Sequence, residues 1–167
     1  MQLFSSLSDF VRRWLLFPFL LTTTPVFAQA LSPTPAQTIQ NAISYGTVGT
    51  NILMDAVTIL RSSDRTCLAK REALRVGLSI ALAESLKAVI TKTRPDGSDR
   101  KSFPSEHTAI AFASSGWSLT YGYAFAIGTG MERRMANKHD EIDVTAGAGI
   151  GLFSRWLGGK LVACPQP

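Results

Sequence analysis

Residues 68–95, LAKREALRVGLSIALAESLKAVITKTRP, decide the fold class. Apolar residues recur through this stretch at intervals of three and four, which is the repeat of one face of an α-helix. The residue before a proline disfavours helical geometry, so we expect a helix over residues 68–91 that stops before Arg94-Pro95. No alternating strand pattern of useful length occurs in the chain. The sequence therefore predicts an all-α protein, a compact helical bundle.

Further helical segments are expected over residues 36–61, 106–120, 121–131 and 137–157. Gly46 and Gly49 are poor helix formers and can break the first of these segments. The segment over 121–131 either continues the helix before it or forms a new one after a bend at Gly122. The small residues of the last segment, between Ala146 and Gly151, permit close helix packing.

The first thirty residues have the pattern of a secretory signal peptide. Arg12 and Arg13 give a positive start, residues 14–21 an apolar run, and Ala28-Gln29-Ala30 a small-x-small cleavage pattern. An uncleaved membrane anchor is the alternative, but the apolar run is shorter than the roughly 20 residues that span a bilayer. We expect a signal peptide over residues 1–30 and one helical domain over 31–167. This implies an exported protein, periplasmic or on the outer face of the inner membrane.

The chain carries a formal net charge of +5. Loss of residues 1–30 removes Arg12, Arg13 and Asp9, which leaves +4. A positive surplus suits an anionic substrate or an anionic membrane surface, although many soluble proteins are mildly basic. No nucleic-acid partner is expected, and the oligomeric state is not predicted. A soluble or peripherally attached domain is preferred to a membrane-embedded one, because Glu84 and Lys87 interrupt the helix over 68–91.

The two cysteines, Cys67 and Cys164, both follow the predicted signal peptide. Disulfides persist in the oxidising compartments that exported chains reach. A bridge would close a loop of about 97 residues, which the chain-entropy estimate values at roughly 4–5 kcal/mol before strain. Two reduced thiols are the alternative, and no metal-binding spacing of Cys and His occurs.

Three groups of polar residues carry the candidate chemistry. In the first, Lys87 and Arg94 lie seven positions apart, about two helical turns, so both cations point to one side if the helix persists to Arg94. An arginine can donate to two phosphate oxygens at once, and a lysine adds a compact charge. Taken alone, the pair is also what an ordinary basic helix end looks like.

The second group is Pro104-Ser105-Glu106-His107. A helix that starts here, with Ser105 as its cap, exposes backbone N–H groups that bind anions. His107 can then donate a proton to a leaving oxygen. A simple cap beside an exposed histidine is the alternative.

The third group is Arg133, His139 and Asp143. Residues 139 and 143 are one helical turn apart, so the carboxylate can hold one imidazole nitrogen and leave the other free to attack. A positioned histidine is a recognised covalent nucleophile. A chance His-Asp pair is the alternative, but the only two histidines of the chain both lie in these groups.

In this order the groups resemble the type 2 phosphatidic acid phosphatase and vanadium haloperoxidase superfamily. Its pattern is Lys-x6-Arg-Pro, then Pro-Ser-Gly-His, then Ser-Arg-x5-His-x3-Asp, and the resemblance covers residues 87–151. The matching residues are Lys87, Arg94, Pro95, Pro104, Ser105, His107, Arg133, His139 and Asp143. Glu106 and Glu132 depart from the pattern, standing where the family has glycine and serine. We expect Glu106 to keep its backbone amide in the site and to turn its carboxylate outward.

The resemblance implies a helical bundle whose active site lies at helix ends, and a metal-independent phosphatase without a cofactor. Lys87, Arg94 and Arg133 would hold the phosphoryl oxygens, assisted by Ser105 and the amide of Glu106. His139 would attack phosphorus, Asp143 would orient it, and His107 would protonate the leaving alcohol. The substrate would be a phosphomonoester or a lipid phosphate or pyrophosphate.

Two rival functions remain open. A degenerate member would bind phosphate or a lipid headgroup without turnover, as the substitution at Glu106 suggests. The same pocket can hold vanadate as a phosphate mimic, so vanadate-dependent halide oxidation is the other rival, and the small size of the chain argues against it.

Overall fold

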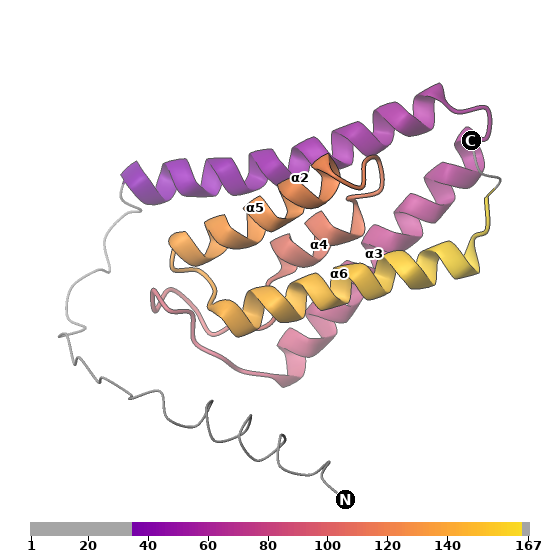
Figure 1. Cartoon of the computed structure of the whole chain (residues 1–167). Helices are drawn as coiled ribbons and strands as arrows, with labels where there is room; N and C mark the ends of the chain where they lie inside the picture. The colour runs from indigo at the N-terminus through magenta and orange to yellow at the C-terminus, as the bar shows by residue number, and fades with distance from the viewer. Residues whose placement is uncertain (1–34, 165–167) are drawn as a thin grey trace, which may run out of the picture. The chain divides into compact units, whose positions relative to one another are not determined.

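The computed structural model describes residues 35–164, so the predicted signal peptide over 1–30 lies outside the described residues. The described part is formed by α2 (Pro35–Arg61), α3 (Arg65–Val89), α4 (Glu106–Ala113), α5 (Tyr121–Met135) and α6 (Glu141–Leu161). It contains no strand, only one isolated bridge between Lys92 and Lys101. The predicted all-α class is confirmed. Figure 1 shows the short α4 at the centre, with the four longer helices around it.

Two predicted helix boundaries were wrong in a way that affects the site. Helix α3 ends at Val89, so Lys87 lies in its last turn and Arg94 lies in the loop that follows, not on the same helix face. The helix expected over 106–120 ends at Ala113. A turn follows because the backbone of Ser115 packs against Gly122, where any side chain would meet the Ser115 carbonyl at 2.4 Å.

The other boundaries also moved. Gly46 and Gly49 do not break α2, which is continuous and packs along α5 and α4. The segment after Gly122 is a separate helix that continues to Met135. The last helix starts at Glu141 rather than at residue 137, because the Asp140 side chain caps it by accepting from the backbone N–H groups of Ile142 and Asp143.

Helices α4 and α6 pack with their backbones close together. A side chain at Gly147 would meet the carbonyl of Ser105, and one at Gly151 would meet the carbonyl of Ala109. The expectation that small residues permit close packing is confirmed at these two positions. This contact sets the start of α4 beside the start of α6, where Ser105 donates its backbone N–H to the Asp143 carbonyl at 3.0 Å.

Small and polar residues fill most of the interior of the described bundle. A small apolar cluster is formed by Val48, Ala111 and Ala126. The buried polar residues on the helices include Ser44, Asn51, Ser79 and Thr129. Many large apolar side chains are instead exposed on the outer faces of the helices. None of the helices over residues 35–164 combines the length and the apolar character that crossing a bilayer requires.

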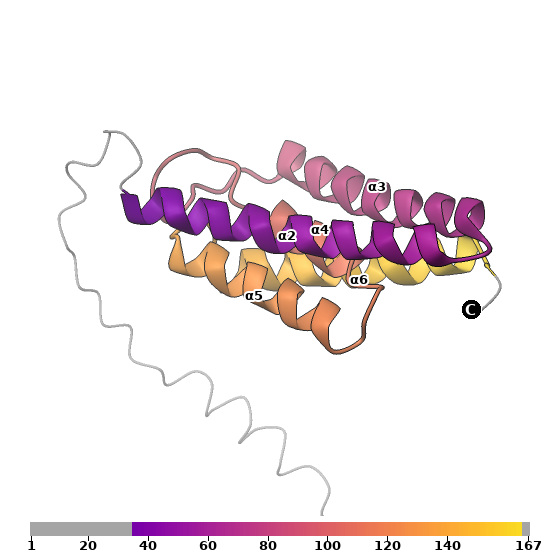
Figure 2. The ribbon, with the colours of Figure 1, turned by 90° about the horizontal axis from the view of Figure 1, so that it is seen from above.

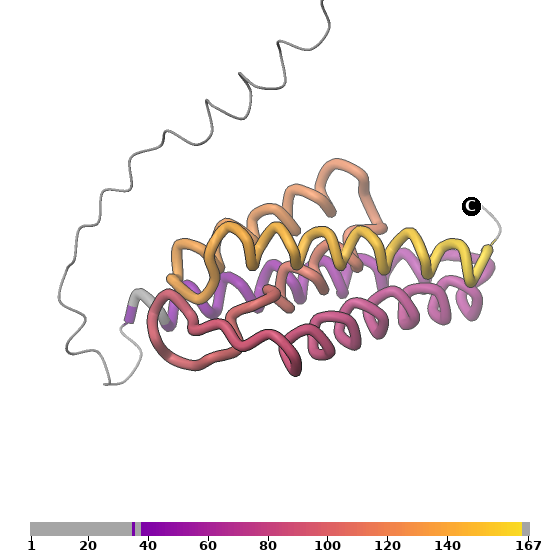
Figure 3. The backbone as a smooth tube through the Cα atoms, turned by 90° about the horizontal axis from the view of Figure 1, so that it is seen from below, coloured from indigo at the N-terminus to yellow at the C-terminus, as the bar shows by residue number. Residues whose placement is uncertain are grey.

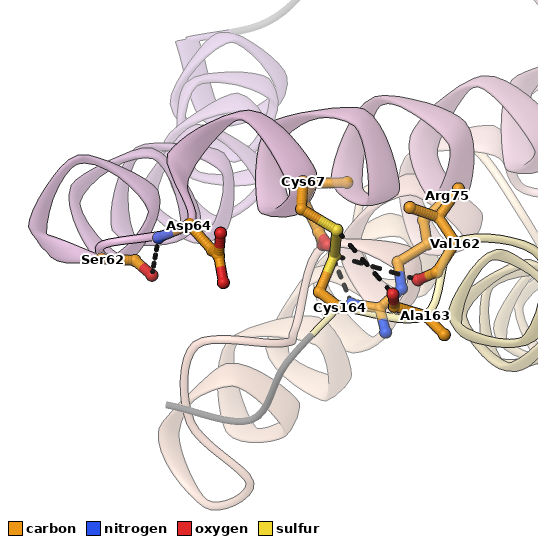
Figure 4. Close-up of a disulfide and its surroundings, with 8 residues drawn as sticks. Ser62, Asp64, Cys67, Arg75, Val162, Ala163 and Cys164 are labelled. Carbon is orange, nitrogen blue, oxygen red and sulfur yellow. Dashed lines mark hydrogen bonds and ion pairs between the residues drawn. A yellow bond between two sulfur atoms is a disulfide. The ribbon is translucent and has the colours of Figure 1, made fainter.

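The two ends of the bundle differ. Figures 2 and 3 show the loop between α3 and α4 at one end, with the end of α5 and the start of α6. At the other end Cys67 and Cys164 form a disulfide, with their Cα atoms 5.8 Å apart, so the predicted bridge is confirmed. It joins the first turn of α3 to the segment after α6 (Figure 4). The bridge therefore fastens the end of the bundle that lacks the predicted site residues.

Candidate active site

The predicted site residues come from the ends of four helices and from two of the segments that connect them, which meet at the end of the bundle opposite the disulfide (Figure 3). Lys87 lies in the last turn of α3, and Arg94 in the loop after it. Ser105 and His107 lie at the start of α4. Arg133 lies in the last turn of α5, His139 between α5 and α6, and Asp143 in the first turn of α6. The expectation that the site forms at helix ends agrees with this placement.

His139 is held by both of its ring nitrogens and is 3 % exposed. Its Nδ1 lies 2.7 Å from the backbone carbonyl of Ser102, and its Nε2 lies 3.2 Å from Nη1 of Arg94. A carbonyl can only accept, so Nδ1 carries the hydrogen and Nε2 keeps its lone pair. That lone pair points toward a guanidinium, the group best suited to hold a phosphate. His139 thus has the tautomer of a nucleophile acting through Nε2.

Asp143 supports His139 less directly than the sequence predicted. Its Oδ2 lies 3.7 Å from Nδ1 of His139, which is an electrostatic contact but not a hydrogen bond. The fully buried carboxylate accepts instead from the hydroxyl of Ser102 at 2.5 Å and from Nζ of Lys92 at 2.7 Å. Asp143 therefore fixes Ser102, whose carbonyl in turn orients the imidazole.

Sequence reasoning missed Lys92 and Ser102 as parts of the site. Lys92 donates to both Asp140 and Asp143, and these two carboxylates, against the opposing effect of burial, raise the pKa of Lys92. Ser102 is fully buried, and its backbone N–H donates to the Lys92 carbonyl at 2.9 Å. No motif or spacing marks either residue, because the residues they contact between His139 and Asp143 are 37 to 51 positions away.

The interval between Arg133 and His139 is set by a turn. The backbone N–H groups of Lys138 and His139 both donate to the Arg133 carbonyl, at 3.1 and 3.2 Å. Asn137 adopts a left-handed conformation with φ of 53°, which lets the chain reverse after α5. This turn therefore brings the backbones of Arg133 and His139 together.

The two arginines are fixed by polar partners, Arg94 by a residue of its own loop and Arg133 by a residue of α2. Arg94 donates through Nε to Asp99 at 2.8 Å, which leaves its Nη1 toward His139. Arg133 is buried, and its Nη1 donates to Oδ1 of Asn41 at 3.2 Å. Burial lowers the pKa of Arg133, and the positive charge of Arg94 lowers it further. The two guanidinium groups are thus near enough to repel each other, as expected where an anion is to bind.

His107 lies within reach of the same cations. Burial, then Arg133, Lys87 and Arg94 in that order, lower the pKa of His107 to about 4. Burial, followed by Arg94 and Arg133, likewise lowers the pKa of His139 to about 4. Arg94 and Arg133 therefore act on both imidazoles and Lys87 on His107, and a pKa of about 4 leaves both rings neutral at pH 7. The ring of Tyr45 on α2 packs edge-on against His107, with ring centroids 4.9 Å apart.

Lys87 forms ion pairs with two carboxylates, those of Glu84 and Glu106. The expectation that Glu106 turns its carboxylate outward was therefore wrong. Nζ of Lys87 lies 2.6 Å from Oε2 of Glu106 and 2.8 Å from Oε1 of Glu84. Glu106 does not turn its carboxylate outward. The Glu106 carboxylate points toward Lys87 instead. The last turn of α3 faces the first turn of α4, and the Lys87 ammonium in that turn offsets the charge of Glu106.

Ser105 was predicted as a site residue, and Glu132 was noted only as a departure from the family pattern. The hydroxyl of Ser105 pairs with the hydroxyl of Thr108 at 2.9 Å and makes no cap to a backbone N–H, although Ser105 occupies the capping position of α4. Glu132 is buried, and burial raises its pKa. Its carboxylate comes within 4.0 Å of Arg133, so it offsets part of that charge.

A cavity of about 710 Å³ opens beside His139. Its lining is Pro95, Met131, Arg134, Met135, Asn137, His139, Asp140, Glu141 and Ile142. Met131, Met135 and Ile142 are all more than half exposed. A substrate that reaches His139 from this side would meet apolar side chains before it met the cations.

The group of His/Cys/Asp/Glu residues that a metal ion would need is not found among the described residues. The positive charges of the site come instead from Lys87, Arg94 and Arg133.

No protein-family profile matches the chain. A stretch of 98 residues is 35 % identical to a protein named lipid A 1-phosphatase of Porphyromonas gingivalis. The match covers 52 % of this chain and 22 % of that protein, so the matched part is about a fifth of the length of that relative.

The fold is similar to the crystal structure of Aquifex aeolicus LpxE. The TM-score is 0.60 at 26 % sequence identity, over 78 % of this chain and 88 % of the LpxE chain. Together with the three motifs and their convergence at one end of the bundle, these two similarities confirm the predicted relationship of this chain to the type 2 phosphatidic acid phosphatase superfamily.

Proposed function

We propose that this protein is a lipid phosphate phosphatase that transfers the phosphoryl group to His139 and then to water. The observation that carries the proposal is the tautomer of His139, whose Nε2 keeps its lone pair and faces Nη1 of Arg94 at 3.2 Å. The similarity to a protein named lipid A 1-phosphatase supports a phosphorylated lipid as the substrate class.

The first step forms a bond between phosphorus and Nε2 of His139 while the bond from phosphorus to the alcohol oxygen breaks. Arg94 and Arg133, with Lys87 at the edge, stabilise the charge on the phosphoryl oxygens. His107 gives its proton to the leaving oxygen, so the product is a neutral lipid alcohol. Water then attacks phosphorus, the bond to His139 breaks, and inorganic phosphate leaves.

His107 must acquire a proton before it can act as an acid. In the empty site its pKa is lowered to about 4 by burial and by Arg133, Lys87 and Arg94. A bound phosphate offsets these cations, so the proton affinity of His107 rises when the substrate binds. We therefore expect a substrate monoanion to bring the proton, or the complex to take one up from solvent.

Metal independence is part of the proposal. Arg94, Arg133 and Lys87 supply the positive charge that a metal ion supplies in other phosphatases. The test is turnover in the presence of a strong chelator.

The nucleophile is tested by trapping. The full chain, incubated with a radiolabelled lipid phosphate and quenched in alkali, should retain label as a phosphohistidine. His139→Ala should remove both the label and turnover, by about a thousandfold or more. His107→Ala should lose more turnover on an alkyl phosphate than on an aryl phosphate, whose better leaving group needs no acid. Label that persists in His139→Ala would refute the assignment.

Binding without turnover is the second candidate, and one observation favours it. Two carboxylates occupy Lys87, so one of the three predicted cations is not free for a phosphate. Calorimetry with inorganic phosphate, combined with turnover assays on lipid phosphates, separates the two. Binding without release of phosphate from any lipid would favour this second candidate.

The setting we propose is outside the cytoplasm, at a membrane surface. The disulfide between Cys67 and Cys164 supports an oxidising compartment. The exposed apolar side chains Met131, Met135 and Ile142 around the cavity support contact with lipid. Flotation of the chain with anionic vesicles tests the surface contact.

A further inference from the structure

Glu106 is the residue whose placement the proposed function does not explain. It is the first residue of α4, next to His107, and its carboxylate lies 2.6 Å from Nζ of Lys87. The Lys87 side chain is 8 % exposed and that of Glu106 is 31 % exposed. A carboxylate is thus paired with the Lys87 ammonium, where a phosphate would otherwise bind.

In the proposed reaction this carboxylate belongs to the residue next to the one that protonates the leaving oxygen. His107, which protonates the leaving oxygen in the proposed reaction, is its neighbour in the chain, and Lys87 is one of the charges that act on His107. The partners of His139 are different: its two ring nitrogens contact Ser102 and Arg94. In the proposed reaction the phosphoryl group under attack would lie toward Arg94, and the group attached to it would lie toward His107, beside Glu106 and Lys87.

In a phosphomonoester the attached group is an uncharged alcohol. In a diphosphate it is a second phosphate, which would enter beside the Glu106 carboxylate and find Lys87 already paired. Like charges placed together in this way cost enough to reject a ligand. Glu84 adds a second carboxylate to the same lysine from the exposed side, 2.8 Å from Nζ.

We propose that Glu106 is a specificity-determining residue, which pairs with Lys87 so that the site accepts a lipid monophosphate and rejects a lipid diphosphate. This inference rests on the proposed function and narrows its substrate class. It does not require Glu106 to take part in the chemical steps.

The test compares farnesyl phosphate with farnesyl diphosphate, which share one hydrocarbon chain. The wild-type protein should show the higher kcat/KM on the monophosphate. Glu106→Gln keeps the size of the side chain and a hydrogen-bond acceptor for Lys87 but removes the charge. It should shift the ratio of the two kcat/KM values toward the diphosphate by about tenfold or more. Glu106→Gly, which restores the residue of the family pattern, should shift the ratio in the same direction.

Glu84→Gln is the matched control. It removes a carboxylate from the same Lys87, but the Glu84 side chain is 51 % exposed and so more strongly screened. The ratio should move by less than about threefold. A merely structural role of Glu106 predicts an equal loss on both substrates, and that result would overturn the inference.

Calorimetry separates this inference from the proposed function. Wild-type protein should bind inorganic phosphate more tightly than pyrophosphate, and Glu106→Gln should reverse or abolish that preference. If the chain binds phosphate and turns over neither lipid, the same calorimetric shift still supports the specificity role. If wild-type protein binds pyrophosphate as tightly as phosphate, the specificity role is refuted even where turnover is observed.

Discussion

Asn41 on α2 accepts a hydrogen bond from Arg133 on α5, with 3.2 Å between Oδ1 and Nη1. A helix that carries none of the family motifs therefore positions one of the arginines of the site. Tyr45, one turn further along α2, packs against His107. The first half of α2 thus forms one wall of the site.

Replacing Asn41 with alanine should weaken substrate binding. The buried Arg133 guanidinium would lose a neutral partner, and the change should lower kcat/KM on a lipid monophosphate by about tenfold, mainly through KM. Steady-state kinetics measure it. Ile43→Ala, at a half-exposed position of the same helix, is the control and should match the wild type. Equal kinetics for Asn41→Ala would remove α2 from the site.

The contact between Lys92 and Asp143 should contribute measurably to stability. Asp143 is fully buried, so Lys92→Met leaves a buried carboxylate that accepts from Ser102 and the Asp140 backbone N–H but has lost its lysine partner. The free energy of unfolding should fall by about 3 kcal/mol. The double variant with Asp143→Asn should recover part of this loss, and urea unfolding of the four proteins gives the coupling. Strictly additive losses would show that the two side chains do not interact.

The two imidazoles should make the protein less stable in acid. Both have a pKa lowered to about 4 in the folded state, so between pH 6.5 and 4 the unfolded state binds more protons. Stability is fully present above pH 6.5 and should fall by about 1–2 kcal/mol per imidazole between pH 7 and 5. Urea unfolding at the two pH values measures the fall. His107→Gln should lose about half of it, and an unchanged fall would contradict the lowered pKa.

Asp55 should have the opposite effect at higher pH. It is buried near the disulfide end, and burial together with the neighbouring Glu72 raises the pKa of Asp55 to about 8, against the opposing charges of Arg155 and Arg75. Between pH 4 and 8 the folded state binds the extra proton, so its contribution to stability decreases as the pH rises. Asp55→Asn should reduce the loss of stability between pH 6.5 and 8 by about 1 kcal/mol. The folded-state histidines are neutral across this window, and their unfolded-state titration near pH 6.5 is the same in the wild type and the variant, so it cancels in the comparison.

Removing the disulfide should destabilise the protein while sparing its catalytic residues. The Cys67→Ser, Cys164→Ser double variant loses a bridge across 97 positions, and the chain-entropy estimate puts the loss at about 4 kcal/mol. Because the bridge and the site lie at opposite ends of the bundle, kcat at a temperature where the variant is folded should stay within about twofold of the wild type. A large fall in kcat of the folded variant would show that the two ends are coupled.

The sequence was sufficient for the fold class and for choosing motif residues that the structure brings together at one end of the bundle, because both depend on local features. Helical periodicity is visible over 68–91, and the motif residues are recognised by type and spacing. Helix ends were less predictable. The early end of α3 at Val89 places Arg94 in a loop, and that loop is held by pairs such as Arg94 with Asp99, which periodicity does not reveal.

The support of the nucleophile could not be read from the sequence. A spacing of four suggested a direct bond from Asp143 to His139, but Ser102, 37 positions before His139, supplies the closer acceptor. The direction of the Glu106 side chain was mispredicted for a similar reason. At the first turn of a helix a carboxylate usually faces solvent, yet the end of α3 brings a lysine within 2.6 Å. Both outcomes depend on contacts between distant segments.

The turn at Asn137 leads us to expect that the third motif tolerates no change of length. Two successive amides, of Lys138 and His139, close on one carbonyl of Arg133, and a left-handed residue makes the reversal. An inserted or deleted residue would rotate the imidazole away from the guanidinium groups even with every motif residue retained. The five residues between Arg133 and His139 fix how far apart these two side chains lie. We therefore expect the number of intervening residues to matter to catalysis more than their identity.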